Sequence, residues 1–230
     1  MSIFVRDKRI STIGLIDDDV SVRQGYRYST EDLDLEAGDI TGPIRSIAPL
    51  IAESRQRFDA MICDYNLKTK NYSFVNGDVL CVQFYRNKLP TVLCTRFEGS
   101  LPLPIRKNRR FIPVVIAPVD LNADVLVESL EICIDELAGK YLKARQPYRA
   151  MLRIEGGEVI GVDRSVLLNI VVPSWNSDHM FTMEIDPSAG EAYEVALAAV
   201  KQGDVARMFA DVNLDAELVD DLFVSEWRLK

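Results

Sequence analysis

The chain has 230 residues, of which 48% are hydrophobic, and a formal net charge of −8. This length suits one large domain or two small ones, and the apolar fraction excludes wholesale disorder. No apolar run approaches the ~20 residues of a membrane span, so we expect no membrane association. The N-terminal apolar run leads straight into three acidic residues without a small-residue cleavage site, which argues against a secretion signal.

The four cysteines lie in apolar strings and form no CxxC pair: Cys63, Cys81, Cys94 and Cys133. This pattern predicts buried free thiols, as in the reducing cytoplasm, and gives no support to a zinc site. The charge is uneven. Residues 1–146 hold 20 Lys and Arg against 20 Asp and Glu, whereas residues 147–230 hold 7 against 15. An acidic second part disfavours binding to nucleic acid.

The first part alternates short apolar strands with helices. Residues 12–16 (TIGLI) predict a buried strand, and Asp19 is placed to cap a helix that runs to about Tyr28. Residues 29–42 are polar and hold at most one short strand near 33–35. Further elements are expected in this order: a helix over about 43–57, a strand ending at Asp64, a loop over 68–76, a helix over 77–86, a strand over 89–95, an irregular segment over 96–110, a strand over 112–116 and a helix over 121–143.

This alternation predicts an α/β fold, a doubly wound five-stranded parallel sheet with helices on both faces. After Pro147 the pattern changes. It predicts a hairpin turning at Gly156-Gly157, two further strands, a helix over about 189–202 and two strands in the tail. We therefore expect two domains, residues 1–146 and a small acidic α+β domain of residues 147–230.

Acidic residues follow two of the predicted strands. Ligands of doubly wound sheets bind beyond the carboxyl ends of the strands. Asp17 and Asp18 follow the first strand and Asp64 follows a later one, so their carboxylates can converge on a cation such as Mg²⁺. An aspartate beside Mg²⁺ can act as a nucleophile toward phosphorus. Thr95, after another strand, could donate a hydrogen bond to a phosphoryl oxygen. The alternative is that these acids only cap helices.

The segments IGLIDDD, FDAMICDYN, LPTVLCT and VVIAPVD together resemble the receiver domain of bacterial response regulators, a flavodoxin-like fold, over roughly residues 10–143. The resemblance implies that Asp17 and Asp18 bind Mg²⁺ together with the phosphoacceptor Asp64. It also implies that the backbone carbonyl of Asn66 completes the metal site and that Thr95 provides the switch hydroxyl.

The sequence departs from this family at one functional position. Pro118 matches the proline after the fifth strand, but Ala117 stands where the family has the switch lysine. A methyl group can neither carry charge nor donate a hydrogen bond. Lys68, Lys70 or Arg96 could supply the missing charge, and Arg96 is the best placed in sequence because it directly follows Thr95.

The loop after Asp64 is also longer than in the family, since Gly77 lies thirteen residues on. The basic run over 106–110 (RKNRR) is either a solvated loop or a grip on an acidic surface, including that of the second domain of this chain. His179 is the only histidine, so a zinc site or a histidine-based catalytic triad lacks support.

These observations predict a two-component-type signalling regulator whose atypical receiver controls a partner-binding domain. The expected partners are proteins, with a histidine kinase as phosphodonor, and a homodimer is one option. The protein would then be no enzyme beyond the phosphorylation and dephosphorylation chemistry of its receiver. The alternatives are a phosphorylation-independent adaptor or scaffold, and an enzyme with catalysis in residues 147–230. The candidate catalytic groups of that region are Asp163, Asp178, Glu184 and Asp186.

Overall fold

The computed structural model describes residues 2–96, 100–162 and 164–229, and the chain divides into two compact units. The first unit comprises Met1–Ser100 and Phe111–Tyr141, and the second comprises Leu101–Arg110 and Leu142–Lys230. The segment Leu101–Arg110 thus groups with the second unit, although it lies inside the sequence range 1–146.

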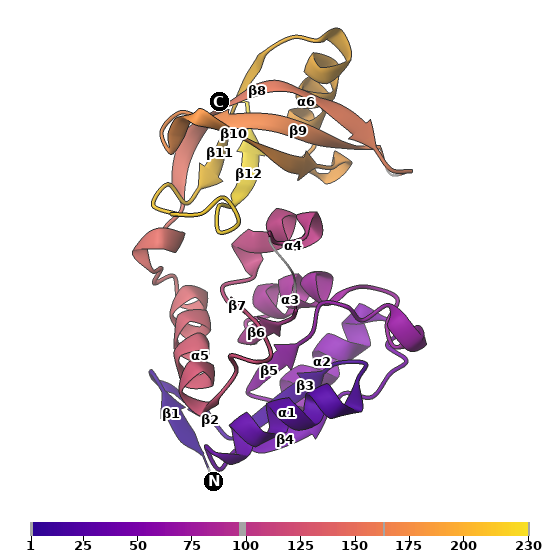
Figure 1. Ribbon diagram of the computed structural model, residues 1–230, viewed down its shortest axis with the longest axis vertical. Coiled ribbons are helices and arrows are strands. Elements are labelled where there is room, and N and C mark those ends of the chain that lie inside the picture. Colours follow the sequence, from indigo (N-terminus) through magenta and orange to yellow (C-terminus); the bar gives the residue numbers. More distant parts are fainter. Residues whose placement is uncertain (1, 97–99, 163, 230) are drawn as a thin grey trace. The chain divides into compact units, whose positions relative to one another are not determined.

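The first unit is built on a five-stranded parallel sheet (Figure 1). Its strands lie side by side in the order β4-β3-β5-β6-β7. Their bounds are β3 Thr12–Ile16, β4 Glu36–Asp39, β5 Ala60–Cys63, β6 Thr91–Cys94 and β7 Val115–Ile116. Numbered along the chain, this is the order 2-1-3-4-5 of the flavodoxin-like fold, which confirms the predicted doubly wound sheet.

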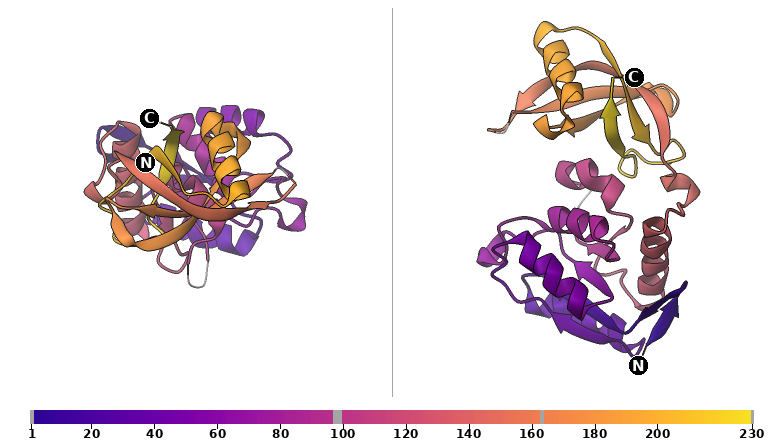
Figure 2. Two further views of the ribbon diagram at one scale, coloured as in Figure 1. Left: turned by 90° about the horizontal axis from the view of Figure 1, so that it is seen from above. Right: turned by 180° about the vertical axis from the view of Figure 1, so that it is seen from behind.

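Helices cover both faces of this sheet (Figures 1 and 2). Helices α1 and α5 contact each other on one face, and α2 and α3 contact each other on the other. Their bounds are α1 Val20–Glu31, α2 Ile47–Arg57, α3 Gly77–Arg86 and α5 Ala123–Leu137. The carboxylate of Asp19 accepts a hydrogen bond from the backbone N–H of Ser21, so the predicted cap of α1 is confirmed.

An N-terminal hairpin precedes the sheet and was not predicted. Its strands β1 (Ile3–Val5) and β2 (Lys8–Ile10) are antiparallel. Arg6, in the left-handed turn between them, makes ion pairs with two carboxylates of α5, at 3.2 Å to Glu131 and 2.9 Å to Asp135. Three-residue strands give too short a pattern to be recognised in a sequence.

Several other boundaries predicted for the first unit need correction. The helix expected over 121–143 ends at Leu137, and the strand expected over 112–116 begins at Val115. The second strand lies at Glu36–Asp39 and not near 33–35, because Asp34 adopts a left-handed turn. Helix α2 begins at Ile47 and not near residue 43, because Ile44 is in an extended segment bridged to Ser73. The segment over 96–110 is not wholly irregular, since it contains helix α4 (Leu103–Asn108).

The second unit combines a five-stranded antiparallel sheet with helix α6 (Glu191–Gln202). Its strands lie in the order β10-β9-β8-β11-β12. Their bounds are β8 Tyr148–Ile160, β9 Ser165–Val172, β10 Asn176–Ile185, β11 Ala206–Val212 and β12 Val224–Arg228. This architecture is the small α+β domain that the sequence predicts. Gly203 ends α6 in a left-handed conformation, which glycine adopts without steric cost.

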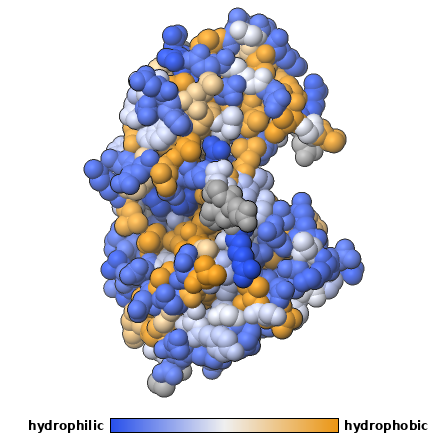
Figure 3. Space-filling model, viewed as in Figure 1, coloured by the Kyte–Doolittle hydropathy of each residue, from blue (hydrophilic) through white to orange (hydrophobic). Residues whose placement is uncertain are grey.

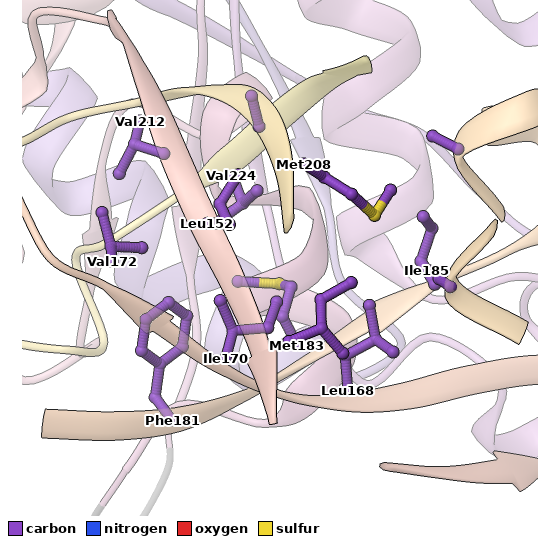
Figure 4. Close-up of a cluster of buried hydrophobic side chains, with 14 of the residues drawn as sticks. Leu152, Leu168, Ile170, Val172, Phe181, Met183, Ile185, Met208, Val212 and Val224 are labelled. Carbon is purple, nitrogen blue, oxygen red and sulfur yellow. The ribbon is translucent and has the colours of Figure 1, made fainter. Parts of the chain in front are cut away.

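The core of the second unit lies where α6 packs on its sheet, and Figure 4 shows the strand side chains that form much of it. The strands contribute Leu152, Leu168, Ile170 and Met208, all fully buried, and α6 contributes Ala196. Burial of each large apolar side chain contributes about 1.5–3 kcal/mol. This core therefore gives the second unit a source of stability of its own.

The predicted hairpin turn at Gly156-Gly157 is wrong. Strand β8 continues through both glycines to Ile160, and a bulge in its pairing with β9 lies between Ile154 and Gly156. Gly157 passes so close to the carbonyl of Leu167 that a Cβ there would lie 2.4 Å from its oxygen. These glycines thus serve strand pairing and not a turn.

Hydrophilic residues cover much of both units on the face shown in Figure 3. Among the described residues, no helix is long and apolar enough to cross a membrane. All four cysteines are buried and free, as predicted.

Candidate functional site

The candidate site lies at the carboxyl ends of the parallel strands, where the strand order reverses between β3 and β5. The register pairs Ile16 with Cys63, and the backbone N–H of Asp64 donates to the carbonyl of Ile16 at 2.8 Å. The residues that follow the two strands are therefore neighbours. They line a cleft of about 170 Å³, whose walls include Asp17, Asp18, Asp64, Asn66, Thr95 and Arg96.

Asp17 is the most deeply buried acid of this cleft, with 3% of its surface exposed. Its carboxylate accepts hydrogen bonds from the backbone N–H of Asp19 at 2.7 Å and from the hydroxyl of Tyr26 at 3.0 Å. Burial raises the pKa of Asp17 to about 6, against the opposing effect of these hydrogen bonds, and the nearby Asp64 raises it further. Such a carboxylate is stabilised when a cation binds beside it.

Tyr26 was not singled out in the sequence. Its hydroxyl also lies 3.2 Å from the carbonyl oxygen of Cys94, so it joins the end of β3 to the end of β6. The buried position of Tyr26 on α1 follows from helical periodicity, but its polar contacts depend on strand pairing that a single sequence does not reveal.

Asp64 and Thr95 form the centre of the cleft. Burial raises the pKa of Asp64, and the Thr95 hydroxyl and the backbone N–H of Asn66, which donates at 2.7 Å, act in the opposite direction. Thr95 is 1% exposed, and its hydroxyl makes no well-formed hydrogen bond to any described residue. A buried hydroxyl without a settled partner costs free energy, and it is available to a group that enters the cleft.

Asp18 is held by the loop that follows Asp64. Its carboxylate accepts a hydrogen bond from the hydroxyl of Thr69 and lies 3.4 Å from the ammonium of Lys70. The same ammonium is 3.8 Å from the carboxylate of Asp19. Neither Thr69 nor this pairing of Lys70 could be read from the sequence, because the loop has no periodic pattern.

The three candidate replacements for the switch lysine occupy different places. Arg96 is exposed and lines the acidic cleft. Lys68 is exposed, and it is not among the described residues that line the cleft. Of these three, only Lys70 forms a described ion pair with a predicted metal ligand, at 3.4 Å to Asp18. Geometry therefore favours Lys70 over Arg96 as the counter-charge of the acids in this conformation.

The long loop after Asp64 is fixed to the segment that follows β4. The carbonyl of Tyr72 accepts a hydrogen bond from the N–H of Ile44 at 2.7 Å, and the Tyr72 hydroxyl donates to the carbonyl of Ile40. Gly42 allows this approach, since a Cβ there would lie 2.7 Å from the Tyr72 ring. Residues of both segments line a second cleft of about 580 Å³, to which Asp18 and Lys70 also contribute.

The donor set suits a hard divalent cation. Asp17, Asp18, Asp64 and Asn66 line one cleft, so oxygen ligands are close at hand, and Mg²⁺ needs only one or two protein carboxylates. Burial is the main cause of the raised pKa values of Asp17 and Asp64, and a cation beside these carboxylates would favour their charged forms. Among the residues described, however, no three His, Cys, Asp or Glu side chains are arranged to hold a metal ion. Asp18 is engaged with Thr69 and Lys70 instead.

The basic run over 106–110 is not a solvated loop. Helix α4 belongs to the second unit, where the amine of Lys107 lies 2.8 Å from Glu184 and 2.7 Å from Asp186. Arg106 donates to the carbonyl of Thr182 at 3.0 Å. Further contacts join Arg109 to Asp221 at 2.9 Å and the N–H of Leu101 to Asp220 at 2.9 Å. The run forms ion pairs with acidic residues of this chain's own second unit, which is one of the options that the sequence leaves open.

The candidate catalytic groups of residues 147–230 gain no support. Glu184 and Asp186 are engaged in ion pairs with Lys107. Asp178 is exposed and accepts a hydrogen bond from the neighbouring Ser177. Asp163 lies outside the described residues.

The comparisons with known proteins concern the first unit. No protein-family model matches the sequence, and no curated protein matches it. Solved structures do match. The first part of the chain is similar to CheY-like receiver domains.

A sensor protein from Polaromonas sp. shares 18% sequence identity over 55% of this chain and 98% of its own, with a TM-score of 0.41. A CheY-like receiver domain protein from Methanospirillum hungatei shares 17% identity over 56% of this chain and 98% of its own, with a TM-score of 0.40. For a chemotaxis protein from Vibrio cholerae the values are 16%, 54%, 98% and 0.39.

Proposed function

We propose that this protein is a two-component-type signalling regulator in which Asp64 accepts a phosphoryl group. The observation that carries the proposal is the buried Thr95 hydroxyl, which lies beside the Asp64 carboxylate without a settled hydrogen-bond partner. A phosphoryl group on Asp64 would offer this hydroxyl a better-placed acceptor than the Asp64 carboxylate does.

The chemistry assigns a role to each residue of the cleft. A carboxylate oxygen of Asp64 attacks the phosphorus of a phosphodonor, the bond from phosphorus to the leaving group breaks, and an acyl phosphate forms on Asp64. Asp17, Asp18 and the carbonyl of Asn66 would hold Mg²⁺. When bound, this ion offsets the repulsion between carboxylate and phosphoryl oxygens. Thr95 donates to a phosphoryl oxygen as charge develops there.

The second unit is proposed to be the part that binds protein partners. Helix α4 lies in sequence between Thr95, which follows β6, and Ala117, which follows β7, yet it packs within the second unit. A conformational change caused by phosphorylation of Asp64 could therefore reach the second unit through the short segment of chain that joins Thr95 to α4. We further propose a histidine kinase as phosphodonor, a cytoplasmic location in keeping with the four free thiols, and no role for nucleic acid. Formation of a homodimer remains a prediction.

A direct test is incubation of the full chain with Mg²⁺ and acetyl phosphate, followed by intact-mass measurement. The proposal predicts one phosphoryl adduct per chain that requires Mg²⁺ and is absent in Asp64→Asn. The variant Thr95→Val, which keeps the shape of the side chain, should form the adduct about 10²-fold more slowly. An adduct that persists in Asp64→Asn, or none in the native chain, would contradict the proposal.

One observation favours a second candidate, an adaptor that works without phosphorylation. Ala117 leaves the switch lysine position without charge, and Lys70 already neutralises Asp18. In that case the native chain forms no adduct, while partner binding is the same for the native chain and Asp64→Asn.

A further inference from the structure

The turn Thr69–Asn71 closes on two of the predicted metal ligands. The Thr69 hydroxyl is within hydrogen-bond reach of the Asp18 carboxylate and 3.4 Å from the carbonyl oxygen of Asn66. The Lys70 ammonium is 3.4 Å from the same Asp18 oxygen. One short turn thus supplies a hydroxyl donor and a positive charge to the ligands that a cation would need.

This turn is held in a costly backbone conformation. Lys70 and Asn71 are consecutive non-glycine residues with positive φ, 49° and 55°. The left-handed region is unfavourable for lysine, although asparagine tolerates it, and a lysine there persists when its surroundings hold it. The contacts of Thr69 and Lys70 with Asp18 are well placed to do so. Once those contacts are lost, the cost of the left-handed conformation favours relaxation of the turn.

The contacts are also accessible. The Lys70 side chain is 65% exposed, whereas the Asp18 side chain is only 12% exposed. The ammonium can therefore move into water at little cost in burial, while the carboxylate stays in the cleft. An ion pair whose lysine end is in water contributes little free energy, so a divalent cation can compete with it.

We propose that the Thr69–Lys70 turn is a built-in counter-ion clip on Asp18, which Mg²⁺ displaces when it enters the cleft. The inference rests on the metal site of the proposed function. It adds that the turn lowers the affinity of this site for Mg²⁺. In the metal-free protein the clip neutralises Asp18. On metal binding the Thr69 hydroxyl and the Lys70 ammonium release this carboxylate, and the turn becomes free to relax. Lys70 also lines the cleft of about 580 Å³. Release of its side chain on metal binding would therefore change the lining of that cleft.

The affinity of the full chain for Mg²⁺, measured by titration calorimetry, tests the clip. Lys70→Ala and Thr69→Val should each bind Mg²⁺ about threefold to tenfold more tightly than the native chain, because each removes one contact that the ion must break. Lys68→Ala is the matched control. It removes the same charge two residues away, from a side chain outside the cleft, and should leave the affinity within about twofold.

Thr69→Val separates the clip from simple electrostatics because it changes no charge. Equal affinities for Thr69→Val and the native chain would overturn the clip, as would equal gains in Lys70→Ala and Lys68→Ala. If Mg²⁺ binds to none of the four proteins, the metal site of the proposed function itself fails. If Mg²⁺ binds to all four with one affinity, only the clip fails.

Chemical reactivity of the lysines gives a readout that does not depend on the variants. Native protein is treated briefly with an amine-acetylating reagent, with and without Mg²⁺, and modification of each lysine is measured by peptide mass spectrometry. Mg²⁺ should raise the modification of Lys70 severalfold and leave that of Lys68 unchanged. Unchanged or lower modification of Lys70 at saturating Mg²⁺ would overturn the clip.

Discussion

Gly77 offers a sharp test of how the phosphoacceptor position is built. It is the first residue of α3, and its backbone packs directly on that of Asp64. A Cβ at Gly77 would lie 1.8 Å from the Asp64 carbonyl oxygen, 2.8 Å from its carbonyl carbon and 3.1 Å from the Cys63 sulfur. The two nearest atoms belong to the backbone, so the clash cannot be relieved by rotating a side chain.

The substitution Gly77→Ala should therefore destabilise the protein. Overpacking of a dense interior costs about 1–3 kcal/mol, and a backbone clash of this depth lies at the upper end. Alanine recovers up to about 1 kcal/mol of helix propensity. We expect a net loss of about 2 kcal/mol in the free energy of unfolding, measured by urea denaturation, together with slower phosphorylation because Asp64 moves.

Gly25 provides the matched control. It lies in the middle of α1, is exposed, and a Cβ there would have nothing within 4 Å. Gly25→Ala should stabilise the protein by about 0.5–1 kcal/mol, because alanine loses less backbone entropy on folding. The two substitutions thus have opposite predicted signs. If Gly77→Ala stabilised the protein as Gly25→Ala does, the reasoning would be refuted.

Three further predictions concern buried polar groups. Because the pKa of Asp17 is raised to about 6 in the fold, the contribution of Asp17 to native stability in EDTA should fall as the pH rises from 4 to 7. Asp17→Asn should then exceed native stability by about 1–3 kcal/mol at pH 7 and match it near pH 4. Lys107→Met should lower stability by about 1–3 kcal/mol, since it leaves two half-buried carboxylates unpaired, whereas exposed Lys143→Met should change it by less than about 0.5 kcal/mol. Asn213 is fully buried with three hydrogen bonds of 2.7–3.0 Å, so Asn213→Leu should cost about 3 kcal/mol. Urea denaturation measures all of these, and an unchanged midpoint for Lys107→Met or Asn213→Leu, or a pH-independent gain for Asp17→Asn, would count against the corresponding argument.

The parts of the fold that the sequence predicts well are those whose signal is local. The run TIGLI is apolar throughout and bounded by acids, so its strand was predicted at Thr12–Ile16, where the structure has it. The alternation of such strands with helices was enough to predict the parallel sheet. Asp17, Asp18, Asp64 and Thr95 could be placed in one cleft because all four lie at or just beyond the ends of predicted strands.

What the sequence could not predict depends on contacts between distant segments. Gly156 and Gly157 read as a turn, but the close approach of β9 explains them. The ion pair of Lys70 depends on the path of a loop without periodicity. Asn213 carries no motif, yet it binds the carbonyls of Ala144 and Asp221. Such contacts are fixed by tertiary packing, which a single sequence does not encode in any short window.

The central claim is that Asp64, Thr95 and the neighbouring acids form a site for a phosphoryl group. The most direct measurement is ¹⁹F NMR of the full chain with beryllofluoride, which imitates a phosphoryl group on a carboxylate. The account predicts protein-bound fluorine resonances that require Mg²⁺ and are absent in Asp64→Asn. The absence of bound resonances in the native chain at saturating Mg²⁺, or identical resonances in Asp64→Asn, would contradict it.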